Sequence, residues 1–419
     1  MRGLTGVKIL AVAACALALS ACGSGSTASP PAATEDAAAD ATTPAIDGAP
    51  ADAGAEAKTP ADSATDATDA GCALHLTDAP GGSADAGWLE ITPLDAGTAA
   101  VVAEKVTYTS SGLQVHAVVC HPADGQRHPT ILFNHGGFTG LNASADGGPP
   151  GAATDISFCT GFANNGFAVG ASSYRGEDGS QGHVEVCLGE VDDVRALMAT
   201  LKTMPYVDPT RFFAFGGSHG GCITERLALA EPSLRGAVDV SGPGDWGALD
   251  AWLHQNLDAG ETEPGCGDGG AATCAVVQQF LVSTVEGAIG GGAAQKPCDY
   301  ADRSPALALG GLAVPTLMAQ GTYDTLVAPS QACQKRQALE SGGRPVMAWD
   351  LDPGLAVRTP SSLCGGPWQS GPLPDVTSPA AWKAADHYLI VYEQQGHTIT
   401  GPALSQLLQA SVSFLESRL

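Results

Sequence analysis

Basic residues are scarce in this chain of 419 residues. Only 19 Lys and Arg stand against 44 Asp and Glu, which gives a formal net charge of −25. Nucleic-acid binding requires basic side chains gathered on one face, and this chain has few to offer. We therefore exclude nucleic acid as a partner. We interpret the excess negative charge as a feature that favours solubility.

Near its start the sequence also lacks an apolar run long enough to cross a bilayer, which takes about 20 residues. The run Ile9–Leu19 is too short, and Arg2 and Lys8 flank it, so residues 1–21 are interpreted as a secretory signal. It ends in Leu19-Ser20-Ala21-Cys22, which resembles a bacterial lipobox. The resemblance implies a lipidated Cys22 that anchors the protein to a membrane of the bacterial envelope, facing the periplasm or exterior. Ordinary secretory cleavage is the alternative.

Spacings typical of metal and nucleotide sites are missing too. No Cys-x-x-Cys or His-x-x-x-His pair occurs, and no Gly-rich loop is followed by Lys, so we expect neither a metal nor a cofactor. The twelve cysteines instead fit an oxidising compartment. Leaving out Cys15 and Cys22, up to five disulfides are possible, with the pairing open. Cys222 is alternatively a buried free thiol.

Residues 22–71 contain Ala, Asp, Thr, Pro and Gly with almost no large apolar side chain. Such a segment buries too little surface to offset its ordering entropy, so we predict a disordered tether. Residues 72–419 are predicted to form the catalytic domain. Trp88, Leu89 and Ile91 are the first side chains expected to dock on its core.

From residue 105 onward, short apolar runs alternate with segments of helical spacing, which predicts an α/β fold with a mainly parallel sheet covered by helices on both faces. A β-hairpin is expected around Ser111-Gly112, before the alternation begins. Two insertions interrupt this alternation of predicted strands and helices. Residues of about 244–301 are predicted to form a lid stapled by one or two disulfides, and a second insertion covers about 351–386.

One stretch combines a strand, a sharp turn and a helix. The apolar run Phe212–Phe215 leads into Gly216-Gly217-Ser218-His219-Gly220, and a helix is expected over Ile223–Ala230. This context is typical of a nucleophile elbow, in which small residues flank a strained serine. The elbow would expose the Ser218 hydroxyl and direct the His219 N–H at a developing oxyanion. A glycine-rich turn without chemistry is the alternative.

A serine nucleophile needs a base, and the base needs an orienting acid. In this architecture the chain order is Ser, acid, His. Asp324 and His397 each follow a predicted strand, which gives the order Ser218, Asp324, His397. Asp352 is an alternative acid. His387 precedes its strand, and His183 is expected on an exposed loop.

The loop His135-Gly136-Gly137-Phe138 follows an early strand and should supply the second oxyanion donor. The N–H of Gly137 or of Phe138 is the candidate, with a simple glycine turn as the alternative. Trp246 and Trp252, in the predicted lid, are candidates for lining an acyl pocket. Core packing is the other interpretation of both.

Together these motifs resemble the α/β-hydrolase superfamily, in particular dienelactone hydrolases and the catalytic domains of prolyl-oligopeptidase-type serine peptidases. The resemblance covers about residue 105 to the C-terminus and implies that Ser218 is the nucleophile, Asp324 the orienting acid and His397 the general base. The matching stretches, in family order, are His135-Gly136-Gly137, Ser173-Tyr174-Arg175-Gly176-Glu177, Tyr206-Val207-Asp208-Pro209-Thr210-Arg211, the elbow, Arg303-Ser304-Pro305, Gly321-Thr322-Tyr323-Asp324 and Gly396-His397.

We thus expect a secreted, lipid-anchored serine hydrolase that acts on a small-molecule or peptide acyl substrate without a cofactor. An ester is favoured, because the predicted tether cannot form the β-propeller that those peptidases carry and no acidic cluster for a peptide amino terminus is identifiable. The alternatives are a prolyl-oligopeptidase-type exopeptidase and a catalytically idle hydrolase fold that serves as a surface binding protein.

Overall fold

The computed structural model describes most of the chain after the predicted tether. The described residues are 72, 74, 87–141, 156–259, 270–358, 364 and 372–419, without the side chains of 258–259 and 270–277. The predicted signal, Cys22 and the tether 22–71 lie outside them. Among the helices of this part of the chain, none has the length and apolar character needed to cross a membrane.

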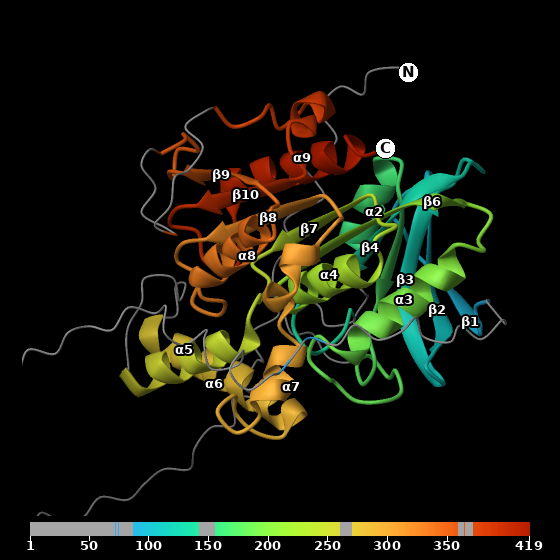
Figure 1. Cartoon of the computed structure of the whole chain (residues 1–419). Coiled ribbons are helices and arrows are strands. Elements are labelled where there is room, and N and C mark those ends of the chain that lie inside the picture. The colour runs from blue at the N-terminus through green and yellow to red at the C-terminus, as the bar shows by residue number, and fades with distance from the viewer. Residues whose placement is uncertain are drawn as a thin grey trace, which may run out of the picture.

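The described strands form one ten-stranded sheet in the order β1-β2-β3-β5-β4-β6-β7-β8-β10-β9 (Figure 1). Pairing is antiparallel from β1 through β5 and parallel from β5 to β9. This is the mainly parallel sheet that the alternating pattern predicts. The strands are β1 (Glu90–Leu94), β2 (Val101–Ser110), β3 (Leu113–Pro122), β4 (His128–Asn134), β5 (Ala168–Ser172), β6 (Val207–Gly217), β7 (Gly236–Val240), β8 (Thr316–Gly321), β9 (Val346–Leu351) and β10 (His387–Tyr392).

The predicted hairpin is the β2–β3 pair. Ser111 and Gly112 form its two-residue turn, and both have positive φ, of 48° and 82°. Two positive φ angles are what a type I′ turn needs to match the twist of the flanking strands. The pair in turn places β3 beside β5 at the start of the parallel region.

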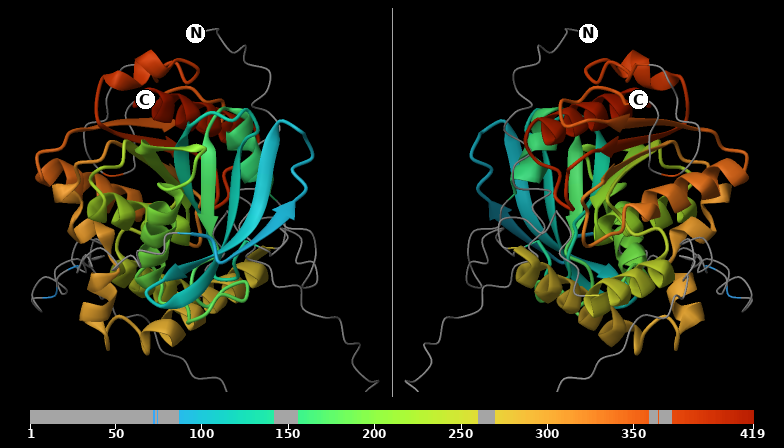
Figure 2. Two further views of the ribbon diagram at one scale, coloured as in Figure 1. Left: turned by 90° about the vertical axis from the view of Figure 1, so that its right-hand side faces the viewer. Right: turned by 90° about the vertical axis from the view of Figure 1, so that its left-hand side faces the viewer.

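Helices cover both faces of the sheet (Figures 1 and 2). Val194 of α3, Ile223 of α4 and Leu339 of α8 belong to the core cluster of one face. Phe158 of α2 and Phe414 of α9 belong to that of the other. The helices on these faces are α2 (Ser157–Asn164), α3 (Gly189–Leu201), α4 (His219–Ala230), α8 (Ser330–Ser341) and α9 (Gly401–Glu416).

The region predicted as a lid is helical. It contains α5 (Trp246–Ala259), α6 (Gly270–Ile289) and α7 (Pro297–Asp302), which gather at one end of the sheet, away from α2 and α9 (Figure 2). Cys298 of α7 is bonded to Cys72, so this disulfide ties the region to an earlier part of the chain. A disulfide within the lid would involve side chains outside those described.

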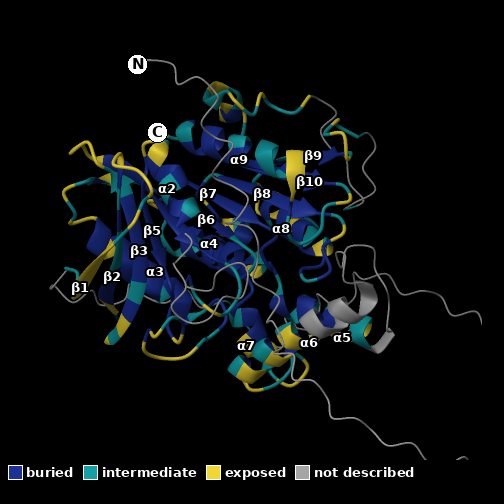
Figure 3. Ribbon diagram, turned by 180° about the vertical axis from the view of Figure 1, so that it is seen from behind, coloured by how far each residue is buried: buried dark blue, intermediate teal, exposed yellow. Residues whose placement is uncertain are grey.

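Two other expectations from the sequence need correction. Leu89 and Ile91 do not dock on the core; they are 55% and 50% exposed at the sheet edge formed by β1, which Figure 3 shows in contrast to the buried central strands. Trp88 does pack against the core. Cys222 is not a free thiol, because it is bonded to Cys187.

The remaining disulfides join sheet to helix and loop to helix. Cys120 of β3 is bonded to Cys159 of α2. Cys333 of α8 is bonded to Cys364, within the predicted second insertion. The described residues therefore contain four disulfides.

Candidate active site

Ser218 lies at the turn between β6 and α4, with φ +55° and ψ −128°. The turn is so tight that a Cβ on Gly216 would lie 2.2 Å from the carbonyl oxygen of Gly220. A Cβ on Gly220 would lie 2.0 Å from the carbonyl oxygen of Asn134. Both glycines of the Gly-x-Ser-x-Gly pattern are therefore required by the backbone, as expected of a nucleophile elbow.

The structure brings Ser218, His397 and Asp324 together. The Nε2 atom of His397 lies 3.0 Å from the Ser218 hydroxyl oxygen. Its Nδ1 atom lies 2.9 and 2.8 Å from the two carboxylate oxygens of Asp324. A ring nitrogen in contact with a carboxylate carries the proton, so the nitrogen that faces Ser218 is free to accept one.

Asp324 is held by groups that leave its carboxylate little freedom. Its Oδ1 atom accepts hydrogen bonds from the backbone N–H groups of Leu326 and Val327, at 3.0 and 2.8 Å. The side-chain amide of Gln320 donates to Oδ2 at 2.9 Å. These three donors hold the carboxylate in the orientation in which it faces His397.

The predicted oxyanion loop lies beside the serine. Gly137, Phe138, His219 and Ser218 line one cavity. Among the described residues, no hydrogen bond engages the backbone N–H of Gly137, Phe138 or His219. These N–H groups are thus free to donate to a substrate oxygen, which is the requirement for an oxyanion hole.

The cavity has a volume of about 600 Å³, counting space open to solvent, and its walls are mainly apolar. Trp246 is in the wall, as the sequence suggested, whereas Trp252 is not and packs against the core instead. Sequence reasoning missed several lining residues. The apolar pattern of α6 was visible, but its position over the serine was not. The missed residues are Thr139, Pro243, Leu249, Phe280, Leu281, Leu326 and Val327.

The competing candidates from the sequence lie elsewhere. Asp352 follows β9 and accepts hydrogen bonds from the N–H groups of Gly354 and Ala356, which closes a turn. His387 is the first residue of β10 and so lies at the opposite end of that strand from the loop carrying His397. His183 is exposed and does not line the cavity.

One group of side chains in the described part of the chain has the composition of a cation site. Asp250, His254 and Glu286 place ligand atoms within 4.8 Å of one another. His254 Nε2 is 2.8 Å from Glu286 Oε1, and Asp250 accepts hydrogen bonds from Ala293 N–H and the Tyr300 hydroxyl. These bonds already account for the geometry, and we assign no ion to the group.

The sheet and the geometry around Ser218 correspond to one known architecture. A mainly parallel sheet, an elbow after β6 and a Ser-His-Asp arrangement at its edge are features of the α/β-hydrolase fold. Solved structures with this architecture are similar to the chain. A putative dipeptidyl aminopeptidase IV from Bacteroides ovatus matches with a TM-score of 0.51 and 16% identity, over 76% of this chain and 36% of that one. A puromycin-hydrolyzing peptidase from Mycobacterium tuberculosis matches with a TM-score of 0.51 and 20% identity, over 77% and 40%. The chain thus spans well under half the length of these two proteins.

The amino-acid sequence is similar to one protein family and to one further protein. The family described as X-Pro dipeptidyl-peptidase (S15 family) matches residues 111–261, a part that contains Ser218 and the loop at Gly137 but ends before Asp324. An uncharacterized peptidase of Bacillus subtilis (strain 168), YtmA, is 25% identical over 244 residues, which are 58% of this chain and 82% of the relative. Both similarities are to proteins described as peptidases, and neither extends over the whole of this chain.

Proposed function

We propose that the protein is a serine peptidase that hydrolyses an acyl bond beside an apolar group. The observation that carries the proposal is the 3.0 Å contact between His397 Nε2 and the Ser218 hydroxyl inside an apolar cavity. A hydroxyl this close to a neutral imidazole transfers its proton as it attacks a carbonyl carbon. Asp324, bonded to the other ring nitrogen, stabilises the imidazolium that forms.

The reaction proceeds in two halves. Ser218 Oγ forms a bond to the carbonyl carbon, its proton passes to His397 Nε2, and the N–H groups of His219 and of Gly137 or Phe138 bind the oxyanion. The C–N bond then breaks, and His397 returns the proton to the leaving amine. In the second half a water molecule gives a proton to His397 and attacks the acyl-enzyme. The bond between the acyl carbon and Ser218 Oγ then breaks, His397 returns the proton to Ser218 Oγ, and the acid leaves.

The family match and the curated relative support a peptidase over the ester hydrolase that the sequence favoured. An esterase remains the second candidate because of one observation. Among the described residues that line the cavity there is no Asp or Glu, so none of these offers a carboxylate for the ammonium group of a free peptide terminus. An ester, or a peptide with a blocked amino terminus, needs no such partner.

Labelling with a fluorophosphonate probe tests the proposal directly. We expect the disulfide-intact protein to be labelled and Ser218→Ala to remain unlabelled at equal folding. Paired assays with N-acyl aminoacyl p-nitroanilides and with p-nitrophenyl esters of the same acyl group then separate peptidase from esterase. If the wild type were not labelled, the peptidase and esterase proposals would both be contradicted, and a catalytically idle binding protein would be favoured.

We also propose that the enzyme is anchored in the bacterial envelope through a lipid on Cys22. The proposal rests on the sequence motif and on the disulfides, which form in compartments outside the cytosol. Incorporation of a radiolabelled fatty acid in the wild type, and its loss in Cys22→Ala, is the expected result. Equal incorporation in the two proteins would contradict lipidation at this residue.

A further inference from the structure

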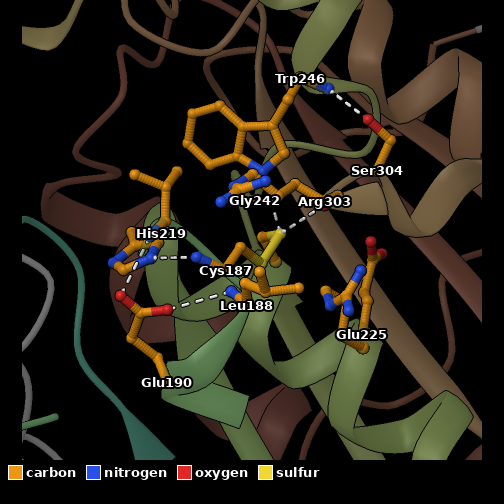
Figure 4. The surroundings of a disulfide bond; sticks show 12 residues. Cys187, Leu188, Glu190, His219, Glu225, Gly242, Trp246, Arg303 and Ser304 are labelled. Carbon is orange, nitrogen blue, oxygen red and sulfur yellow. Dashed lines mark hydrogen bonds between the residues drawn. A yellow bond between two sulfur atoms is a disulfide. The ribbon is translucent and has the colours of Figure 1, made fainter. Parts of the chain in front are cut away.

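The imidazole of His219 is not used in the reaction described above, yet it is buried beneath the oxyanion loop. Only 2% of the residue is exposed. Its Nδ1 atom is 3.1 Å from the carbonyl oxygen of Gly137. Its Nε2 atom accepts the backbone N–H of Cys187 at 2.9 Å, as Figure 4 shows. The Phe138 ring packs against it, with 4.6 Å between ring centroids.

These contacts fix which nitrogen of His219 carries the proton. Since the Cys187 N–H can only donate, Nε2 is the acceptor, and Nδ1–H must be the donor to the Gly137 carbonyl. Burial lowers the pKa of His219 to about 4, so the ring is neutral at neutral pH. The neutral tautomer with its proton on Nδ1 is the only form that satisfies both partners.

The backbone N–H of Cys187, which selects this tautomer, is itself held in place. Cys187 has a φ of +61° and is bonded through its sulfur to Cys222 in the first turns of α4. The carboxylate of Glu190 accepts the N–H groups on either side of Cys187, at 3.1 Å for Val186 and 3.0 Å for Leu188 (Figure 4). The Cys187 N–H is thereby left to point at His219.

The hydrogen bond from His219 to the Gly137 carbonyl restricts the peptide unit that carries the Phe138 N–H. A trans peptide is planar, so the Gly137 carbonyl and the Phe138 N–H point in opposite directions from one rigid unit. Gly137 has a φ of +73°, a position where glycine leaves the backbone freedom to turn. Holding the carbonyl against His219 removes that freedom and fixes the N–H groups of the loop beside Ser218.

We propose that the imidazole of His219 is a positioning residue for the oxyanion hole, with the Cys187–Cys222 disulfide as its support. The proposal rests on the serine hydrolase function proposed above. One residue then has two functions: its backbone N–H is an oxyanion donor, and its side chain orients the loop that carries the other donor. His219 is not a second general base, because both ring nitrogens are engaged and the ring does not contact the Ser218 hydroxyl.

Two amide substitutions separate the two bonds of the ring. In His219→Asn the side-chain N–H₂ reaches the place of Nδ1 and can donate to the Gly137 carbonyl, but nothing reaches Cys187. In His219→Gln the amide reaches the place of Nε2 and can accept from Cys187, while the Gly137 carbonyl loses its donor. Both variants lose the same ring packing on Phe138, so each is the matched control for the other.

Steady-state kinetics and a peptidyl trifluoromethyl ketone, which forms a tetrahedral oxyanion on the serine, provide the test. We expect His219→Gln to lower kcat about 10- to 100-fold with KM within about twofold, since loss of a whole oxyanion donor costs on the order of 10²–10³. His219→Asn should retain kcat within about fivefold of the wild type. Inhibitor affinity should fall in parallel with kcat.

The possible results distinguish a failure of the positioning role from a failure of the proposed function. Equal kcat losses in the Asn and Gln variants, or losses confined to KM, would overturn the positioning role while leaving an active wild-type enzyme. A wild type that neither turns over nor reacts with the probe would instead overturn the proposed function, and this inference with it. Thermal unfolding of both variants, expected to agree within a few degrees, excludes a difference in folding as the cause.

Discussion

At the scale of single residues, the site depends on backbone positions that ordinary side chains avoid. Ser218 has a φ of +55°, a strain that costs on the order of 1–3 kcal/mol at a non-glycine residue. The strain persists because Gly216 and Gly220 allow the close approach and because the Ser218 N–H donates to the Val240 carbonyl at 2.9 Å. The serine is therefore presented to the cavity before any substrate arrives.

The variant Asp324→Asn tests whether Asp324 is the acid that orients His397. The amide would favour the wrong tautomer of His397, so we expect kcat to fall by about 10³–10⁴ with little change in KM. Asp352→Asn is the matched control, because Asp352 only closes a turn with Gly354 and Ala356. A large loss in the control and none in Asp324→Asn would reassign the acid to Asp352.

A second prediction concerns Glu177, which is 3% exposed and lies 3.8 Å from His135 Nε2. Burial, together with the charge of Glu190, raises the pKa of Glu177 to about 9. Between about 4.5, the ordinary value, and 9 the folded protein holds one proton more than the unfolded chain. This contribution to stability is complete below the lower value and is lost as pH rises through the window.

We therefore expect Glu177→Gln, which mimics the protonated acid, to be more stable than the wild type at alkaline pH. Its advantage in Tm should grow steadily from pH 5 to pH 9 in thermal unfolding. The exposed Glu90→Gln should show no such trend. A difference between Glu177→Gln and the wild type that does not change with pH would show that Glu177 does not titrate in this window.

At the scale of elements, the disulfides on the two faces of the sheet offer a controlled comparison. Cys187–Cys222 lies beside the elbow and spans 35 residues, and Cys120–Cys159 joins β3 to α2 across 39 residues. Loops of similar length constrain the unfolded chain to a similar degree, so each bond should contribute about 2–4 kcal/mol to stability. Only the first one supports the oxyanion loop.

Replacing each pair by alanine tests this difference. Both double variants should lose similar stability in urea unfolding, whereas kcat should fall only in Cys187→Ala/Cys222→Ala, about tenfold, measured well below Tm. The variant Cys120→Ala/Cys159→Ala should retain the wild-type kcat. Equal kcat in the two double variants would contradict a specific function of the Cys187–Cys222 bond.

The helix α6 contributes the outer wall of the cavity. Phe280 lines the cavity although 53% of the residue is exposed, a position from which it can cover a bound apolar group. We expect Phe280→Ala to raise KM for long apolar acyl substrates about three- to tenfold, with kcat little changed, since full burial of such a side chain contributes about 1.5–3 kcal/mol and a substrate would cover Phe280 only in part. Short acetyl substrates should be unaffected. An equal effect on both would contradict contact with the substrate.

At the scale of the whole molecule, one disulfide closes most of the described chain into a loop. Cys72 and Cys298 are separated by 226 residues, and neither lines the cavity. Replacing both by serine should lower the free energy of unfolding by about 2–5 kcal/mol and leave kcat at low temperature unchanged. Urea unfolding and enzymatic activity, measured in parallel, test this prediction. If the variant lost folded structure and activity together at low urea concentration, the disulfide would be required for the shape of the site.

The α/β architecture, the elbow and the chain order of the three site residues could all be predicted from the sequence. These follow from local patterns, since apolar periodicity marks strands and helices and a tight turn demands glycine at Gly216 and Gly220. The placement of Asp324 and His397 after their strands also followed, because parallel strands bring their carboxyl ends to one edge.

Which side chains contact one another could not be predicted in this way and became clear from the folded structure. The partner of Cys222, the exposure of Leu89 and the absence of Trp252 from the cavity depend on how distant elements pack, which no local pattern encodes. The function of the His219 side chain depends on contacts with Gly137 and Cys187, distant in sequence from it and from each other. Local patterns fix the direction of the backbone, whereas the fold brings remote hydrogen-bond donors and acceptors within hydrogen-bonding distance of one another.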